Sequence, residues 1–534
     1  MASRDSSVMN APSIDRGRVF KDFTAGMENV PDVSAIQDNA LAEIINMELD
    51  ASGALVSRPP YVKLNNTPVG GQAIEFLGYF NRADGTTFAV VATTTQTRLW
   101  DPNTGTYTLI ASFPASGCVQ YQNRLYLVCR TQAGGWWGET TPGSGTYTFQ
   151  SLSGGVKPMP KGDQIALFKE RLFIAGWGDS DERTKVYLSE VTNTTGGDIN
   201  NWPPLNFFYV GRGDGQWITK LWAGPNDLTV FRNASAAYFS YDADPALGSL
   251  NKYEGNIGCD NKYSLAMYQN YVYVISNGAL YQLISYQFYR RNDPAKFAFS
   301  PKTTATPYTV TSALSGLGSR MIVWYSGSIY VYNVTTNTWS EWESVHAPAV
   351  FRTIQRPEGY FGPDVAYGVS GSGESARFAM YKISDGFDFT ASESMICRIK
   401  TKAYDYQTPD RYKTLYWWLA DVLISSDITG TAVPITLTAY TTTWDDMSLK
   451  TWDELALGTW DHPTIKIPGV VTNQTVPSGT PSRVSVKFRK KMRFRRVFYE
   501  LSMPTDGSAS KAPVHLFSIV TYMTDKNKVS RGVT

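Results

Sequence analysis

The amino-acid sequence predicts an all-β protein, and three observations lead to this prediction. From about residue 66 onward, short runs of β-branched and aromatic residues alternate with Gly, Asn, Asp and Pro turns. A seven-residue phrase recurs through much of this region at a nearly regular interval. Helical periodicity is confined to one short segment near the N-terminus.

The first 65 residues are expected to form an arm with one short docked helix. Residues 34–37, Ser-Ala-Ile-Gln, have the pattern of a capping box. The apolar residues that follow share one face at helical spacing: Ile36, Ala40, Leu41, Ile44 and Ile45. The turn at 50–53 ends this helix, and Arg58-Pro59-Pro60 predicts an extended exit.

The recurring phrase predicts a β-propeller over residues 66–390. Its pattern is aromatic, any residue, small or polar, polar, aliphatic, aromatic, aliphatic. Copies occupy residues 121–127, 168–174, 268–274 and 325–331, with a weaker one at 224–230. Successive copies start 44 to 57 residues apart, the size of a four-stranded blade. Six or seven blades would fill the region, and a β-sandwich or a stack of hairpins is the alternative.

A second phrase supports the same architecture. Residues 100–107 and 332–339 each place an Asx, Thr and Gly or Asn turn between aromatic strand residues. Hairpins at 76–91 and 361–383 are candidates for the first and last blades. Residues 391–534 lack the repeat and contain longer strands, such as 395–404 and 415–424, so they predict a separate C-terminal β domain resembling a sandwich.

The composition argues against most enzyme classes. The chain has only 3 His and 4 Cys, and its net charge is +2. His346, His462 and His515 lie far apart, and we find no phosphate loop, zinc-protease motif or nucleophile elbow. We therefore predict a protein that is not an enzyme and has no catalytic residues, metal or cofactor.

Other features indicate a chain that folds in the cytosol and does not cross a membrane. Cys118, Cys129, Cys259 and Cys397 form no close pair, which predicts reduced, buried thiols. The start has no apolar signal segment, and the apolar run 415–424 is too short for a membrane span and contains an Asp. Carboxylates at 179–182 and 241–244 are expected to be solvated turn residues rather than calcium ligands.

Two patterns in the C-terminal region could form contact surfaces. Thr-Trp-Asp recurs every eight residues in an insertion near 443–462, which places Trp444, Trp452 and Trp460 on an exposed aromatic surface or in a small hairpin core. Basic residues alternate with apolar ones along 483–495, so Arg489, Lys491, Arg493 and Arg495 would form a basic strand face. A subunit contact or a solvated face is expected there rather than duplex DNA binding.

Both ends of the chain resemble one family. Residues 23–31 and 46–60 resemble the opening of phage tail nozzle proteins, the tail tubular protein B or packaged-DNA stabilisation type of short-tailed bacteriophages. The core of the pattern is Asn46, Gly53, Leu55, Arg58 and Pro59. Many relatives have Gly where this chain has Pro60. The closing segments 492–501 and 528–533 resemble the C-terminal sheet of the same family.

The resemblance implies a structural virion protein of the tail, assembled in the host cytoplasm. Such nozzles form a hexameric ring below the adaptor, enclose the DNA channel, retain packaged DNA and open for ejection into the host. The implied partners are other copies of the chain, the adaptor, tail fibres or spikes, and transiently the exiting DNA. We expect the five core residues to mark the subunit or adaptor contact. The alternative is a propeller glycan-binding protein or glycosidase acting at the cell surface.

Overall fold

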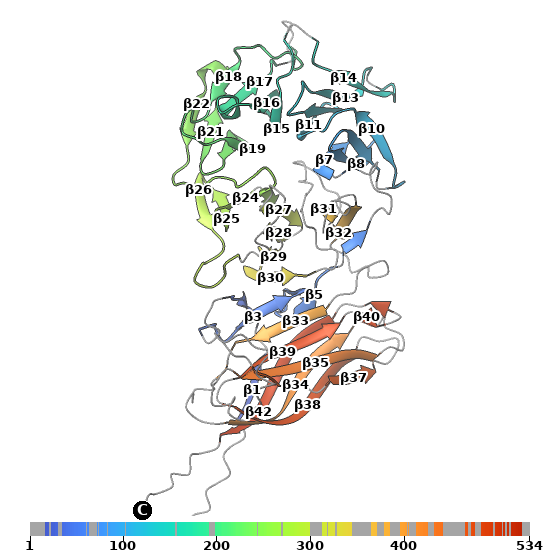
Figure 1. The fold of residues 1–534 in the computed structure, drawn as a ribbon, viewed down its shortest axis with the longest axis vertical. Coiled ribbons are helices and arrows are strands. Elements are labelled where there is room, and N and C mark those ends of the chain that lie inside the picture. The colour runs from blue at the N-terminus through green and yellow to red at the C-terminus, as the bar shows by residue number, and fades with distance from the viewer. Residues whose placement is uncertain are drawn as a thin grey trace, which may run out of the picture.

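The protein, seen in a computed structural model, consists of a ring of β-sheets and a β-sandwich beneath it (Figure 1). The structure describes residues 16–20, 23–29, 35–59 and 61–63. It describes residues 72–299 apart from short gaps (73, 83, 102, 142, 155–156, 192–197, 243 and 269–270). Between 312 and 525 it describes the strands named below and a few residues beside them.

The ring is a seven-bladed β-propeller whose first five blades are antiparallel four-stranded sheets in chain order, and whose sixth blade is the four-stranded antiparallel end of a larger sheet. Blade 1 is β7 (Ile74–Asn81), β8 (Thr87–Thr93), β9 (Thr97–Trp100) and β10 (Tyr107–Ala111). Blade 2 is β11 (Gly117–Tyr121), β12 (Arg124–Val128), β13 (Gly135–Glu139) and β14 (Tyr147–Ser151). Blade 3 is β15 (Gly162–Phe168), β16 (Arg171–Gly176), β17 (Lys185–Leu188) and β18 (Phe207–Tyr209), with the short 3-10 helix η1 (Glu182–Thr184).

The next blades repeat this plan. Blade 4 is β19 (Ile218–Ala223), β20 (Leu228–Arg232), β21 (Ala236–Ser240) and β22 (Ser249–Lys252), with η2 (Pro245–Leu247). Blade 5 is β23 (Leu265–Tyr268), β24 (Tyr271–Ser276), β25 (Ala279–Ile284) and β26 (Gln287–Arg290). Blade 6 is β27 (Ser312–Leu317), β28 (Arg320–Tyr325), β29 (Ser328–Asn333) and β30 (Thr338–Trp342).

The seventh blade combines two distant parts of the chain. Its strands are β31 (Val365–Ser370), β32 (Ala379–Ser384) and the N-terminal β6 (Tyr61–Lys63). β6 pairs antiparallel with β32, so Tyr61 lies opposite Ile383. The start of the chain therefore completes the last blade.

In blades 2 to 5 the repeated phrase is the hairpin between the first and second strands, whereas the copy at 325–331 joins the second and third strands of blade 6. In blade 2 the turn residues Gln122 and Asn123 have φ values of 46° and 57°, and in blade 3 Lys169 and Glu170 have φ values of 45° and 60°. Positive φ at both central residues is the geometry of a type I′ turn, which matches the twist of paired strands. The second phrase is likewise the turn between the third and fourth strands of blades 1 and 6.

Aromatic side chains fill the spaces between neighbouring blades. Phe80 of blade 1 meets Trp137 of blade 2 edge to face, with ring centroids 5.4 Å apart. Phe231 of blade 4 meets Phe288 of blade 5 in the same way, at 6.3 Å. Such pairs stabilise packing beyond the area they bury, which accounts for much of the aromatic content in the repeat region.

The sandwich is built from both ends of the chain. One sheet has the order β38-β34-β42-β5-β4, with β1 also paired to β42. The other continues from blade 6 as β30-β3-β33-β39-β35-β36, with β2 beside β3 and β37 beside β35. The N-terminal strands are β1 (Arg16–Phe20), β2 (Gly26–Met27), β3 (Ala40–Ile45), β4 (Met47–Leu49) and β5 (Leu55–Ser57). The C-terminal strands are β33 (Ile396–Thr401), β34 (Lys413–Ile424), β35 (Ala432–Thr441), β36 (Ile465–Ile467), β37 (Val471–Thr475), β38 (Ser482–Phe494), β39 (Val497–Pro504) and β42 (Val514–Asp525), with the small hairpin β40 (Asp506–Gly507) and β41 (Ser510–Lys511).

The predicted N-terminal helix is wrong, because the segment that would form it contains β3 and β4. β3 buries Ala40, Leu41, Ile44 and Ile45, and a bulge between Leu41 and Glu43 shifts the side-chain alternation. The resulting pairs of apolar residues mimic helical spacing. The predicted strands at 395–404 and 415–424 are present as β33 and β34.

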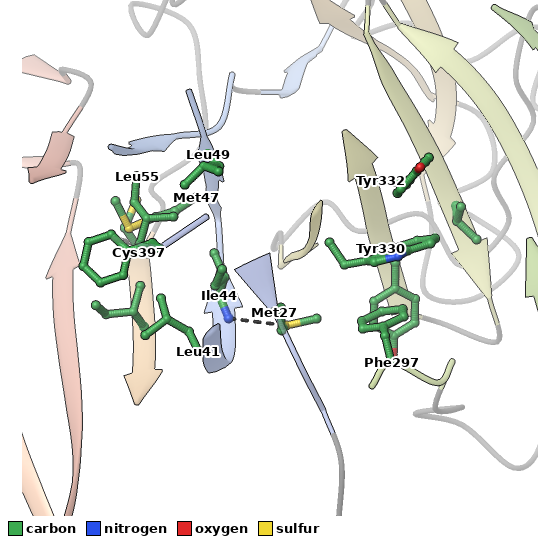
Figure 2. Close-up of a cluster of buried hydrophobic side chains, with 14 of the residues drawn as sticks. Met27, Leu41, Ile44, Met47, Leu49, Leu55, Phe297, Tyr330, Tyr332 and Cys397 are labelled. Carbon is green, nitrogen blue, oxygen red and sulfur yellow. Dashed lines mark hydrogen bonds between the residues drawn. The ribbon is translucent and has the colours of Figure 1, made fainter. Parts of the chain in front are cut away.

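A single hydrophobic core joins the propeller to the sandwich. Figure 2 shows Met27 and Ile44 between the sandwich residue Cys397 and the blade 6 residues Tyr330 and Tyr332. The Ile44 backbone amide donates to the Met27 sulfur at 3.3 Å. The same core also contains residues of β5, β39 and β42. The N-terminal strands thus provide the apolar contact between the two parts of the molecule.

Candidate functional site

Asn46 and Arg58, which carry the family resemblance, meet in a buried polar joint. Asn46 lies between β3 and β4 with φ 56°, and Arg58 follows β5. The Asn46 Oδ1 accepts hydrogen bonds from the Arg58 Nε and from the backbone amide of Glu343, both at 2.8 Å. The Asn46 Nδ2 donates to the Ile396 carbonyl at 2.9 Å. One amide therefore ties blade 6 to both sandwich sheets.

The Arg58 guanidinium completes this joint. Its Nη1 donates to the Pro59 carbonyl at 2.8 Å, and its Nη2 donates to the Glu343 carbonyl at 2.9 Å. Its central carbon lies 5.4 Å from the centre of the Trp342 ring. Arg58 is only 1% exposed. A planar group with several fixed donors fits these acceptors, and a lysine could not make the same set of bonds.

The other residues of the motif serve the same joint within one chain. Leu55 is 0% exposed, and Pro59 is buried. Gly53 has φ 83° in the turn between β4 and β5, where a glycine avoids backbone strain. We expected these residues to mark a subunit or adaptor contact. Because Asn46, Leu55 and Arg58 are buried inside the chain, their side chains act in the intramolecular joint, and a contact made by the rest of the N-terminal segment stays a prediction.

The C-terminal candidates are described only in part. Arg489, Lys491 and Arg493 lie on β38, which confirms the predicted strand, while Arg495 falls outside the described residues. Trp444, Trp452 and Trp460 also fall outside them. Their proposed contact roles stay predictions.

The central channel of the propeller contains a second candidate site, formed by the first strands of the blades and the loops beside them. A cavity of about 620 Å³ opens beside Arg130, Trp177, Arg183 and Trp217. The central guanidinium carbons of Arg130 and Arg183 lie 4.0 and 4.4 Å from the Trp177 ring centre. The Arg183 Nε is buried without a hydrogen-bond partner among the described residues. A ligand in this cavity would therefore meet the indoles of Trp177 and Trp217 and the guanidinium of Arg183.

An ionic cluster around the buried Asp163 lies between this cavity and a second one. The Asp163 Oδ1 accepts from the Arg130 Nε at 2.7 Å and from the Lys262 Nζ at 3.2 Å. The Lys262 Nζ also donates to the Ser116 carbonyl at 2.9 Å. Burial alone raises the pKa of Asp163, but the two cations outweigh it and hold that pKa below its usual value. The carboxylate is therefore ionised and fixes both cations across the channel.

The second cavity, of about 380 Å³, lies on the other side of Lys262 and Tyr263, which line both. Lys220 of β19 projects from its wall together with Cys118 of β11. Burial lowers the pKa of Lys220 to about 8 and raises the pKa of Cys118 to about 11. The cavity thus combines a half-buried amine with thiol and apolar groups.

Neither channel cavity is predicted by the sequence motifs. Asp163 and Lys220 come from the first strands of two different blades, and Lys262 precedes the first strand of a third. The available signal was a charged residue just before or inside a buried strand that leads into the repeat phrase, as in Gly162–Phe168 and Ile218–Ala223. Such a residue must face either a neighbouring blade or the channel.

Several other expectations can be compared with the structure. Cys129, Cys259 and Cys397 are buried free thiols, as predicted, whereas Cys118 is a free thiol that is only partly buried because it lines the smaller channel cavity. The Asp179 and Asp244 carboxylates accept backbone amides at the starts of η1 and η2, which confirms their role in turns. Within the described residues, no group of three or more His, Cys, Asp or Glu could hold a metal ion, and no helix there has the length and apolarity to span a membrane.

Comparison with known proteins adds little beyond the fold. No family model matches the chain, and no curated protein matches it. Among solved structures it is similar to a catalytically inactive virginiamycin B lyase from Staphylococcus aureus with quinupristin, at 10% identity and a TM-score of 0.39, covering 61% of this chain and 99% of that one. It is also similar to the AfRom2 CNH domain, at 7% identity and a TM-score of 0.40, covering 61% and 100%. At these scores neither protein's activity bears on this chain.

Proposed function

We propose that this chain is a structural subunit of a phage tail nozzle, a non-enzymatic ring that encloses the DNA channel, retains packaged DNA and opens for ejection. The observation that carries the proposal is the Asn46–Arg58 joint. The residues that resemble the nozzle family form a buried connection between the propeller and the sandwich. The residues that carry the resemblance to nozzle proteins therefore have a specific structural role in this chain.

A rigid connection between the propeller and the sandwich suits a subunit that must hold its position in a ring that retains packaged DNA. The second sandwich sheet runs into blade 6 through the pairing of Ile45 with Glu341. Relative motion of the two parts would break these backbone bonds as well as the buried Arg58 bonds. The expected assembly is a hexamer in the virion tail that docks on the adaptor and accepts fibres or spikes around it.

Electron microscopy of the purified full chain, alone and mixed with its adaptor, tests the proposal. We expect rings of identical subunits, and labelled antibodies should bind the tail tip of the particles. A strict monomer under both conditions, with no label on the tail, refutes the nozzle assignment.

The joint provides a sharper version of this test. Arg58→Met removes the guanidinium and retains an apolar side chain, so we expect fewer or irregular rings from a chain whose propeller still folds. Arg212→Met is the matched control, because Arg212 is 62% exposed and pairs with Asp181 on the surface. Equal ring formation by both variants would show that the joint is not needed for assembly.

A second candidate function, glycan binding, is favoured by the larger channel cavity. Trp177 and Trp217 line it, and Trp217 is 43% exposed. Exposed indoles can stack on sugar rings, as aromatic anchors do in many binding sites. A glycan array with the wild-type chain, Trp217→Ala and the comparably exposed control Tyr289→Ala tests this function. Binding that depends on Trp217 alone supports it, and an empty array with the wild-type chain refutes it.

A further inference from the structure

The smaller channel cavity has the charge pattern of an anion site. Among the residues that line its volume of about 380 Å³, the charged ones are Lys220 and Lys262, and no carboxylate lines it. Lys262 is already held by the Asp163 carboxylate and the Ser116 carbonyl. The Lys220 ammonium has no hydrogen bond or ion pair within the described part of the chain, although the Asp163 carboxylate acts on it as a nearby charge. One ammonium group therefore lacks a directly paired anion.

The rest of the cavity wall is largely apolar. Phe76, Leu167, Leu221 and Trp222 contribute to it. The Trp222 Nε1 donates to the Met267 sulfur at 3.1 Å, which holds the indole in place. A volume of this size is near the lower end of the range for small-molecule sites. The cavity therefore matches a ligand with one ring or a short chain better than a bare ion.

We propose that this cavity binds a small organic carboxylate, whose anionic group pairs with the Lys220 ammonium and whose apolar body lies against Phe76 and Trp222. Charge-assisted hydrogen bonds to a partly desolvated ammonium are stronger than neutral ones. The apolar wall adds the burial that a bare anion could not provide. The site is in the propeller channel and does not depend on the nozzle assignment.

The pKa values of Lys220 and of the groups around it are consistent with a carboxylate ligand. The groups that act on Lys220 are Cys259, Lys262, Asp163 and Cys118. Burial raises the pKa of Cys118 to about 11 and that of Cys259 to about 12, so both thiols are neutral near pH 8. Lys220, with its pKa lowered to about 8, changes charge in this range. A bound carboxylate would raise that pKa again.

Isothermal titration of the full chain with benzoate and, separately, octanoate tests the proposal. We expect the wild-type chain to bind at least one probe with a Kd below about 10 mM. Lys220→Met should lower the affinity at least about tenfold. Lys252→Met is the matched control, because Lys252 lies on the exposed outer strand of the same blade, and it should bind as the wild type does. The wild-type affinity should fall as the pH rises from 7 to 9.

Labelling of the wild-type chain keeps the test independent of variant folding. A water-soluble acylating reagent should modify Lys220 at pH 8, and a bound carboxylate should protect that lysine but not Lys252, as read by peptide mass spectrometry. Absence of binding to the wild type, or equal binding by Lys220→Met, overturns the proposal. Inorganic phosphate that binds as tightly as benzoate, with the same dependence on Lys220, would overturn the assignment of an organic ligand.

Discussion

Replacing Lys220 by Met is expected to stabilise the folded protein at neutral pH. The pKa of Lys220 falls from its usual 10.5 to about 8 in the fold because burial disfavours the charged amine. This difference corresponds to about 3 kcal/mol of penalty when the amine is protonated in both states. Methionine has a similar length and carries no charge, so Lys220→Met should recover up to this amount.

The lowered pKa of Lys220 also determines how the stability of the wild-type chain changes with pH. Between pH 8 and 10.5 the unfolded chain holds a proton on Lys220 that the folded chain has lost, so the wild-type stability rises with pH in that window. The penalty is complete below about pH 8 and absent above about pH 10.5. The advantage of Lys220→Met should therefore be largest at pH 7 and shrink toward zero near pH 11.

Urea unfolding followed by tryptophan fluorescence at pH 7, 9 and 10.5 measures this difference. Lys252→Met controls for the loss of a positive charge, and as an exposed residue it should change the unfolding free energy by less than about 0.5 kcal/mol. If Lys220→Met is less stable than the control at pH 7, or its effect is the same at every pH, the desolvation argument is refuted.

Three further substitutions test the joint and the channel. Arg58→Lys should lower the unfolding free energy by about 3 kcal/mol, because it leaves buried acceptors of the joint without donors, and thermal unfolding measures the loss. Asp163→Asn should cost about 2 kcal/mol at pH 7 by leaving the nearly buried Lys262 and the half-buried Arg130 without their carboxylate. Because the folded pKa of Asp163 lies below its unfolded value, the cost should shrink in urea titrations as the pH falls below about 4. Gly26→Ala should cost at least about 2 kcal/mol by calorimetry, since Gly26 has φ 69° and a Cβ there would lie 2.6 Å from the Thr338 Cβ. Its control Gly85→Ala, with φ 81° and open space, should cost only about 1 kcal/mol.

The propeller was predictable because its signal is local. The turn at Gln122 and Asn123 requires particular backbone angles, and the aromatic residues beside it must fill the gap to the next blade. The phrase therefore recurs at the first hairpin of blades 2 to 5 and at the second hairpin of blade 6. The same reasoning found the turn residues of the third and fourth strands in blades 1 and 6.

The N-terminal segment could not be predicted in the same way. β3 lies between β30 and β33, so its burial is set by strands some 300 to 350 residues away in sequence. A strand that buries Ala40, Leu41, Ile44 and Ile45 has the same spacing of apolar residues as an amphipathic helix. Likewise, Lys220 and Lys262 line one cavity, and Lys262 pairs with Asp163, only when the ring brings different blades together.

The order of strands along the chain also constrains how the protein is made. β1, β3 and β5 precede the propeller in sequence, yet their partners β33 and β42 follow it, and β6 pairs with the later strand β32. Ribosomes add about 5 to 20 residues per second, so the first strands must remain without their partners for tens of seconds. Blades 1 to 5 can form as local hairpins during this interval, the ring can close once β32 is made, and the sandwich is completed only near the end of synthesis. A chain truncated before β42 would therefore expose unpaired strand edges and would be more easily cleaved by proteases than the complete chain.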